Sequence, residues 1–248
     1  MEQLPVVEIP DGEDDFRRRR AVYLGQAQEL MTTYEDRLKD PRWRPVSYSG
    51  DKRISCYELD AGEDEGYNLK AECIVEGKTA DMIAAAHRNH QAIPRRTWDG
   101  ADIHDIGLLE KVREMDITAQ LRMELNVQYA EHKPVVPGVA IREFVYLEAS
   151  LRETTTANDE DHKWTIMTRE TRHPKRPIKT DPVRALSRTI MVLIPLPPAD
   201  LDGIPIPRTS VTLVAWVDPG GAVPISVIKL YKTKLADRLA FLKTTMFV

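Results

Sequence analysis

Cysteine is scarce in this chain, and its scarcity excludes one common kind of site. Cys56 and Cys73 are the only cysteines among 248 residues, and both lie in segments that we expect to be strands. Two cysteines cannot complete a four-ligand zinc site, and no spacing typical of one is present. A reduced, cytoplasmic setting therefore fits the sequence best.

A surplus of positive charge is also missing. The formal net charge is -4, whereas proteins that bind nucleic acids usually carry a basic excess that neutralises phosphates. The four arginines at residues 17–20 directly follow four carboxylates between residues 11 and 15, which offset much of their local field. We therefore expect no nucleic-acid partner.

Long apolar runs are absent too. No stretch reaches the 18 or so apolar residues that a membrane-spanning helix needs. The N-terminus is acidic and contains prolines, unlike a secretory signal. We expect a soluble chain in which residues 1–13 form a flexible tail and residues 14–248 form a single domain, because this length can bury one large core.

Motifs of catalysis and nucleotide binding are not found. The sequence contains no G-x-S-x-G, no G-x-G-x-x-G and no P-loop. His87 and His90 have a spacing that can chelate a metal, but no carboxylate or cysteine cluster accompanies them. We predict a protein that is not an enzyme and has no cofactor.

What the sequence does contain is a clear order of elements. Apolar residues at helical spacing predict a helix from Phe16 to Leu38, which ends before Pro41. Residues 43–77 alternate between turns and predict three strands, and a short helix begins at Thr79 or Asp81. Six further extended runs follow, at residues 105–116, 118–129, 140–152, 164–172, 184–195 and 208–217.

The last 25 residues change from strand to helix periodicity. Their apolar residues stand three or four apart, and Pro224 suits the first position of a helix. The elements together predict an α+β fold with a curved antiparallel sheet of about nine strands. Such a sheet cannot bury its inner face alone, so the last helix must cover it, and side chains or a ligand fill the space between them.

Four segments resemble, in the same order, motifs of one family. They are Arg95-Arg96-Thr97-Trp98-Asp99 (R-x-x-W-D), Arg142-Glu143-Phe144-Val145-Tyr146-Leu147 (R-D-[FY]-V-x-[LV]), His173-Pro174-Lys175-Arg176-Pro177 (H-P-x-x-P) and the turn from Asp218 to Pro224. The chain resembles the START family (steroidogenic acute regulatory protein-related lipid transfer) from about Thr79 onward, and within it the phosphatidylcholine-transfer branch. The resemblance implies a helix-grip fold and a carrier that holds one lipid, a phospholipid or a sterol, in an internal cavity.

The resemblance also implies that a buried pair of opposite charges meets the polar part of the lipid. This sequence departs from that pattern, because Glu148 stands where the family often has arginine and the usual acidic position falls at Glu124 or Asn126. A charge-reversed pair of Arg122 and Glu148 is one possibility. Tyr146 is a candidate for an aromatic cage around a quaternary ammonium, although no second aromatic residue of such a cage can be named.

Simple alternation favours a different arrangement of residues 121–129. The odd-numbered residues are apolar, so they would face the core and leave Arg122, Glu124, Asn126 and Gln128 in water. The family's parity instead turns Tyr146 and Glu148 toward the cavity. Both arrangements remain open on the sequence alone.

The resemblance assigns the terminal helix and the 131–139 loop to a gate that opens at a transient membrane surface. On the helix, the implied ligand contacts are Ile228, Tyr231 and Leu235. The implied membrane contacts are Val135 and Val136 in the loop and Lys229 and Lys232 on the helix. The alternatives are an ordinary hairpin loop and a solvated helix face.

Two functions of other classes compete with the lipid carrier. The same scaffold could hold an enzyme that acts on a hydrophobic substrate, or a module whose lid docks a protein partner when lipid is bound. The first would require a polar residue whose removal stops turnover without emptying the cavity, and the second would bind its partner differently with and without lipid.

Overall fold

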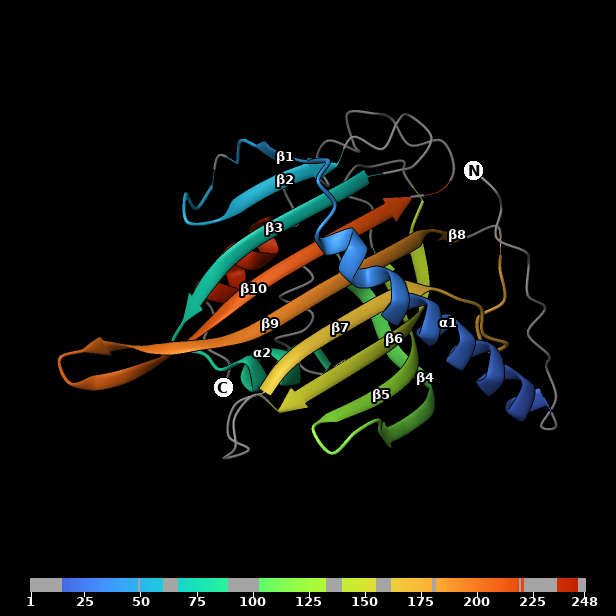
Figure 1. Ribbon diagram of the computed structural model, residues 1–248. Coiled ribbons are helices and arrows are strands. Elements are labelled where there is room, and N and C mark those ends of the chain that lie inside the picture. Colours follow the sequence, from blue (N-terminus) through green and yellow to red (C-terminus); the bar gives the residue numbers. More distant parts are fainter. Residues whose placement is uncertain are drawn as a thin grey trace.

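The computed structural model describes residues 15–48, 50–59, 67–88, 103–132, 140–154, 162–179, 182–218, 220 and 236–244. Its centre is a curved sheet (Figure 1) whose strand order is β1-β2-β3-β10-β9-β7-β6-β5-β4, with all neighbours antiparallel. The strands are β1 (Trp43–Val46), β2 (Ser55–Leu59), β3 (Tyr67–Glu76), β4 (Ile103–Asp116), β5 (Leu121–His132), β6 (Arg142–Thr154), β7 (His162–Glu170), β9 (Leu186–Leu201) and β10 (Ile204–Asp218). The short β8 (Val183–Arg184) pairs in parallel with β6.

Helices cover both faces of this sheet. The helix α1 (Asp15–Leu38) crosses one face, which we call the outer face, while α2 (Ala80–Arg88) and a helix over residues 236–244 lie on the other, the inner face (Figure 1). α1 ends at Leu38, three residues before Pro41, since a proline disfavours helical geometry in the residue before it. No helix among the described segments is long and apolar enough to cross a bilayer.

Each face carries its own hydrophobic core. On the outer face, Tyr23, Ala27 and Leu30 of α1 pack against strand residues such as Leu125 and Leu147. On the inner face, the α2 and C-terminal helix residues pack over the strands; the buried set includes Val75, Ile83, Ile166, Leu193, Val211, Leu213, Leu239 and Leu242. The sheet is therefore buried on both sides, which decides where its polar residues can lie.

The predicted order of elements is confirmed, with β8 as one short strand beyond the nine expected. The short helix begins where predicted, because the Thr79 hydroxyl accepts a hydrogen bond from the backbone N–H of Met82 at 3.2 Å. The strand predicted at residues 118–129 lies three residues later, at Leu121–His132. Residues 117–120 form the turn, where the Thr118 hydroxyl accepts from the N–H of Leu121 at 3.1 Å.

The predicted glycine turn after the last strand is also found at Gly220. This residue has φ 63°, and its N–H donates to the Asp218 carboxylate at 2.9 Å. A Cβ atom at Gly220 would lie 2.8 Å from the carbonyl oxygen of Arg184. Only glycine satisfies both the backbone angle and the close approach.

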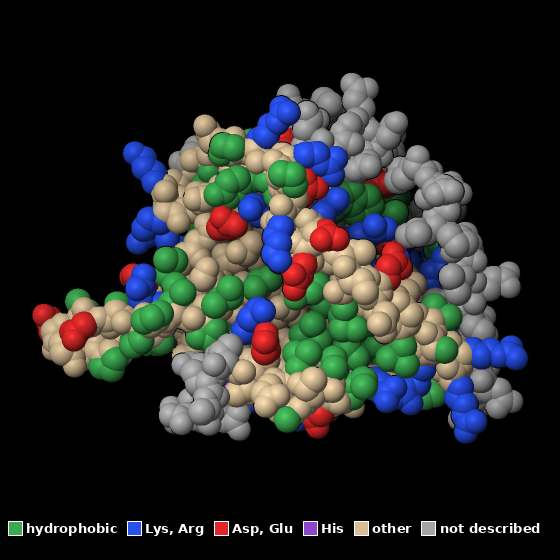
Figure 2. All heavy atoms as spheres, in the orientation of Figure 1, with side chains coloured by type: hydrophobic (Ala, Val, Ile, Leu, Met, Phe, Trp, Pro, Cys, Tyr) green, Lys and Arg blue, Asp and Glu red, His purple; other side chains and the backbone are tan. Residues whose placement is uncertain are grey.

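A two-stranded hairpin projects beyond the body of the sheet. Residues 194–201 of β9 extend past β7, residues 204–207 of β10 extend past β3, and the two strands remain paired with each other along this arm. Apolar side chains lie along this arm (Figure 2), and Leu201 and Ile204 are its most exposed large apolar residues. Asp200 and Asp202 lie at its tip. Its five prolines lack N–H groups, which protects these edges from pairing with other strands.

Several residues singled out in the sequence lie outside the described part of the chain. They are the tail at residues 1–13, the R-x-x-W-D segment, the predicted gate residues Val135, Val136, Lys229 and Lys232, and the predicted lid contacts Ile228, Tyr231 and Leu235. Of the predicted terminal helix, residues 236–244 are described.

Candidate functional site

A polar patch is buried on the inner face beneath α2. Even-numbered residues of β5 and β6 point to this face, and the register places Asn126 opposite Glu148 and Gln128 opposite Tyr146. All four side chains are buried, with 5% of Asn126, 1% of Glu148 and none of Gln128 exposed. We call these four residues the inner polar patch.

The patch corrects the arrangement that simple alternation favours. Alternation placed Asn126 and Gln128 in water and the odd-numbered residues in the ligand-facing core. Instead, Met123, Leu125 and Val127 pack on the outer face under α1, while the even-numbered amides are buried on the opposite face. The prediction fails because both faces of the sheet are covered, so an apolar stripe on one face does not imply water on the other.

Two basic side chains of α2 reach this patch. His87 Nε2 lies 3.4 Å from the carboxylate of Glu148, and Arg88 forms an ion pair with Glu124. Burial lowers the pKa of the Arg88 guanidinium from its ordinary value, and the charge of Glu148 acts in the opposite direction. The end of α2 therefore closes over two strand carboxylates.

Hydrogen bonds within the strands complete this arrangement. Glu124 Oε1 accepts from the amide of Asn126 at 2.8 Å, and Glu148 Oε1 accepts from the hydroxyl of Ser150 at 3.3 Å. The Arg88 guanidinium also lies 5.3 Å from the centre of the Trp164 ring. The two carboxylates are thus linked to both α2 and their own strands.

The predicted charge-reversed pair of Arg122 and Glu148 does not form. Arg122 lies opposite Arg152 in the strand register, four residues along β5 from Asn126, which faces Glu148. Arg122 instead forms an ion pair with Glu114, and both side chains are about half exposed. Strand spacing is the reason, because four residues along a strand separate two positions by about 13 Å.

The amide groups of the patch are the strongest sign of a binding function. Among the described residues, neither Oε1 nor Nε2 of Gln128 has a hydrogen-bond partner, and Oδ1 of Asn126 has none either. A buried polar group without a partner costs about 1–3 kcal/mol, and native proteins contain few of them. These atoms are therefore available to a bound molecule on the inner face.

The start of α2 is fixed to the sheet by Asp81. Its carboxylate accepts from Nε1 of Trp164 at 2.7 Å and lies 2.8 Å from Nδ1 of His162. His162 in turn contacts Arg152 at 2.6 Å through Nε2. An acidic residue in the first turn also interacts favourably with the helix dipole, so α2 is held at both ends.

Three polar contacts hold the C-terminal helix over the inner face. The buried Lys78 ammonium donates to the carbonyl of Leu242, Lys243 lies 3.0 Å from Asp51, and the Tyr48 hydroxyl donates to Asp237 at 2.5 Å. Its apolar side meets the inner core through Ala236, Leu239 and Leu242. The helix is thus a docked cover for this face.

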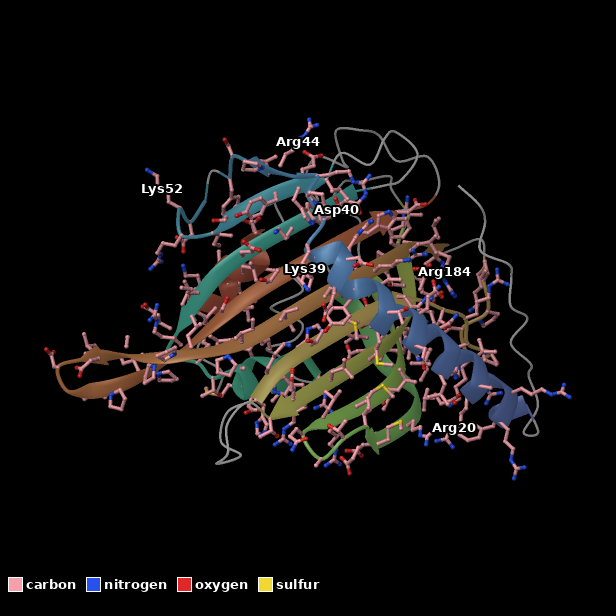
Figure 3. All side chains as sticks on the ribbon, in the orientation of Figure 1. Arg20, Lys39, Asp40, Arg44, Lys52 and Arg184 are labelled. Carbon is pink, nitrogen blue, oxygen red and sulfur yellow. The ribbon has the colours of Figure 1, made fainter. Side chains whose placement is uncertain are left out.

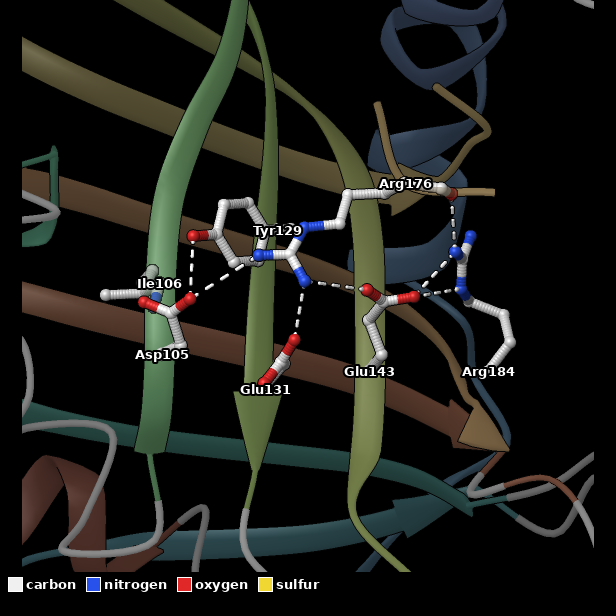
Figure 4. Close-up of polar contacts among 7 residues, drawn as sticks. All are labelled: Asp105, Ile106, Tyr129, Glu131, Glu143, Arg176 and Arg184. Carbon is white, nitrogen blue, oxygen red and sulfur yellow. Dashed lines mark hydrogen bonds and ion pairs between the residues drawn. The ribbon is translucent and has the colours of Figure 1, made fainter. Parts of the chain in front are cut away.

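The H-P-x-x-P segment has a structural role at the end of the sheet, near Arg184 in Figure 3. Arg176 lies over the ring of Tyr129, with 3.7 Å from its guanidinium carbon to the ring centre. It donates to Glu131 at 2.5 Å and to Glu143 at 3.2 Å, and Arg184 donates to Glu143 at 2.7 Å (Figure 4). The network clamps the last residues of β5 to the first residues of β6.

Cys73 on the inner face offers a probe of the docked helix. Burial raises the pKa of its thiol to about 11, and the nearby Lys243 ammonium opposes this shift only in part. Because the ordinary pKa is 9.0, we expect about a hundredfold less thiolate at pH 8 and correspondingly slow alkylation by iodoacetamide. The rate should rise about tenfold per pH unit up to pH 11. A Cys56→Ser variant isolates the signal, and alkylation as fast as in the unfolded chain would contradict the expectation.

Two important residues were misjudged or overlooked in the sequence. Simple alternation placed Gln128 in water and the family resemblance did not name it, and His87 was considered only as a metal ligand with His90. No group of three or more potential metal ligands occurs within the described ranges. The sequence did contain a signal for a buried polar patch. Glu124, Asn126 and Gln128 lie on one face of a strand, and the chain has enough helices to cover both faces of its sheet.

A curved antiparallel sheet held between helices, with a polar patch buried on the face under a terminal helix, defines the helix-grip class of binding domain. A family model, the START domain, matches residues 22–244 of this chain. The chain therefore belongs to the START family and is a domain of the lipid-binding, lipid-transfer type. The predicted family and fold are confirmed, while the phosphatidylcholine-transfer branch stays a prediction.

Individual relatives are distant in sequence. Ceramide transfer protein of Mus musculus is 23% identical over 235 residues, which cover 90% of this chain and 34% of that protein. The chain thus spans about a third of that relative's length. Human StAR-related lipid transfer protein 5 has a similar structure, with a TM-score of 0.66 and 17% identity over 90% of this chain and 96% of that one. A STAR-related lipid transfer protein fragment from Xanthomonas axonopodis has a TM-score of 0.55 and 18% identity over 82% of this chain and 97% of that one.

Proposed function

We propose that this START domain holds one lipid between the inner face of the sheet and the C-terminal helix, and carries it between membranes. The observation that supports the proposal most is the buried amide of Gln128, whose polar atoms have no hydrogen-bond partner among the described residues. The rest of the inner face carries an apolar core. An apolar surface under a movable cover suits an acyl chain or a sterol body. Burial of that body contributes about 25 cal/mol per Å².

The inner polar patch is the proposed contact for the lipid's polar end. Glu124, Asn126, Tyr146 and Glu148 keep the ligand-binding role expected from the sequence, and Gln128 joins them. Arg122 is left out, because it is exposed and bound to Glu114. Ile228, Tyr231 and Leu235, which the sequence predicts to lie in the terminal helix, complete the proposed set.

Exchange with the membrane is proposed to involve two gates and no covalent step. The C-terminal helix and the loop that contains Val135 and Val136 open at the bilayer, and Lys229 and Lys232 meet anionic headgroups. The ion-pair network around Arg176 supports a loop that opens while the sheet stays fixed, since it holds the end of β5 and the start of β6 on either side of that loop. We place the protein in the cytoplasm, consistent with the unpaired Cys56 and Cys73.

Lipid carriage can be tested on gently purified protein. Native mass spectrometry should show one lipid per chain, and the protein should accelerate transfer of a fluorescent phospholipid or sterol between two liposome populations above the rate without protein. Absence of any bound lipid together with no accelerated transfer would refute the proposal. Conversion of the bound lipid to a new mass during incubation would favour the alternative, an enzyme on this scaffold.

A further inference from the structure

Among the described residues, the charged side chains around the inner polar patch leave no arginine free for a phosphate group. The three arginines near the patch are each engaged: Arg88 with Glu124, Arg122 with Glu114, and Arg152 with His162. Phosphate binding in proteins relies on arginine or lysine side chains that can donate to its oxygens. Within the described part of the chain, this end of the inner face offers two carboxylates and no uncommitted arginine.

The neutral groups of the patch indicate the opposite kind of ligand. Gln128 offers a donor and an acceptor that no described residue uses, and Asn126 offers a further acceptor. Both residues are on β5, two positions apart on the same face, so one small polar group can meet both. A hydroxyl or an amide supplies the matching donor and acceptor, whereas a phosphodiester supplies only acceptors.

We infer that the cargo is a lipid with an uncharged head that carries a free hydroxyl or amide, selected by Gln128. This inference rests on the proposed function, lipid carriage, and deepens it by naming the class of cargo. The phosphate of a phosphate-headed lipid would bring a negative charge next to Glu124 and Glu148, where every nearby arginine among the described residues is already engaged, which is unfavourable in a buried site. A lipid without a donor would leave the amide oxygens unpaired.

Lipids that differ only in their heads test the inference. The full chain is incubated with vesicles that contain equimolar dioleoylglycerol, 1,2-dioleoyl-3-acetylglycerol and dioleoylphosphatidylcholine, and bound lipids are quantified by mass spectrometry. We expect dioleoylglycerol, with its free hydroxyl, to be bound at least about tenfold over either of the others, since a buried hydrogen-bonding site discriminates strongly against analogues that lack the group. Equal binding, or a preference for phosphatidylcholine, would overturn the inference.

A pair of variants assigns the selection to one side chain. Gln128→Leu keeps the size of the side chain and should bring the ratio of dioleoylglycerol to its acetylated form close to one, while total bound lipid is retained. Gln120→Leu, at an exposed glutamine in the turn before β5, is the matched control and should leave the ratio unchanged. An unchanged ratio in Gln128→Leu would overturn the role of Gln128. Should that variant not fold, the ratio in the unmodified chain still decides the cargo class. A chain that binds none of the three lipids, carries no lipid as purified and transfers no sterol between liposomes would refute the proposed function instead.

Discussion

Replacing Leu239 with Asp should strip bound lipid from the protein, with at least a tenfold loss of lipid per chain in native mass spectrometry. Leu239 is fully buried where the C-terminal helix meets the inner face. A carboxylate there would lose its hydration without gaining a partner, which costs several kcal/mol. The three polar contacts described for this helix involve Asp237, Leu242 and Lys243 and give a carboxylate at position 239 no partner. We therefore expect the helix to undock and expose the inner face.

The matched control for this variant is Leu239→Met, which conserves volume and should cost less than about 1.5 kcal/mol. It should retain lipid at the unmodified level. Far-UV circular dichroism checks that Leu239→Asp keeps its sheet, whose outer core under α1 is separate from this helix. If a folded Leu239→Asp chain retained lipid fully, the C-terminal helix would not be the cover.

Replacing Leu147 with Ala should lower the free energy of unfolding by about 2–5 kcal/mol without changing which lipid is bound. Leu147 is fully buried in the outer core between β6 and α1, and truncation leaves a cavity that the packed surroundings fill only in part. For a chain of this size, each kcal/mol lowers the melting temperature by about 2–4 °C. Differential scanning calorimetry of the lipid-free protein measures this loss.

Lipid selectivity distinguishes a loss of stability in the outer core from a change on the inner side of the sheet, where lipid is proposed to bind. Leu147 and Glu148 are neighbours in sequence but lie on opposite faces of β6, so the Leu147→Ala variant should keep the head preference of the unmodified chain. Leu108→Ala, at an exposed apolar residue of β4, should change stability by less than about 0.5 kcal/mol. An altered head preference in folded Leu147→Ala would show that the two faces are not independent.

The elements of this fold were largely predictable because each has a local cause. Proline at position 41 ends α1, Thr79 caps α2, and Gly220 provides the backbone angle of the last turn. The strand at Leu121–His132 was misplaced by three residues, since the turn that precedes it depends on the Thr118 hydroxyl, which accepts from the N–H groups of Gln120 and Leu121, rather than on glycine or proline. Such a boundary can be predicted only when the residue that causes it is recognised.

The candidate site was predictable only in part. The parity of Tyr146 and Glu148 followed from the resemblance to the START family, but the partner of Glu148 did not. His87 lies 61 residues before Glu148 in the chain and approaches it from α2, and Arg88 of the same helix reaches Glu124. The spacing of residues within one segment cannot predict a contact between a helix and a strand that is distant in sequence.

The amino-acid sequence by itself determined the order of helices and strands, the family and the residues that face each way along each strand, because these depend on local geometry and on alternation. Only the tertiary structure decided which of the two faces of β5 and β6 is covered by α1 and which by α2 and the C-terminal helix. Burial is a property of the packed layers rather than of one strand. For that reason the glutamine that alternation assigned to water, Gln128, lies without exposure beside Tyr146 on the face proposed to hold the lipid.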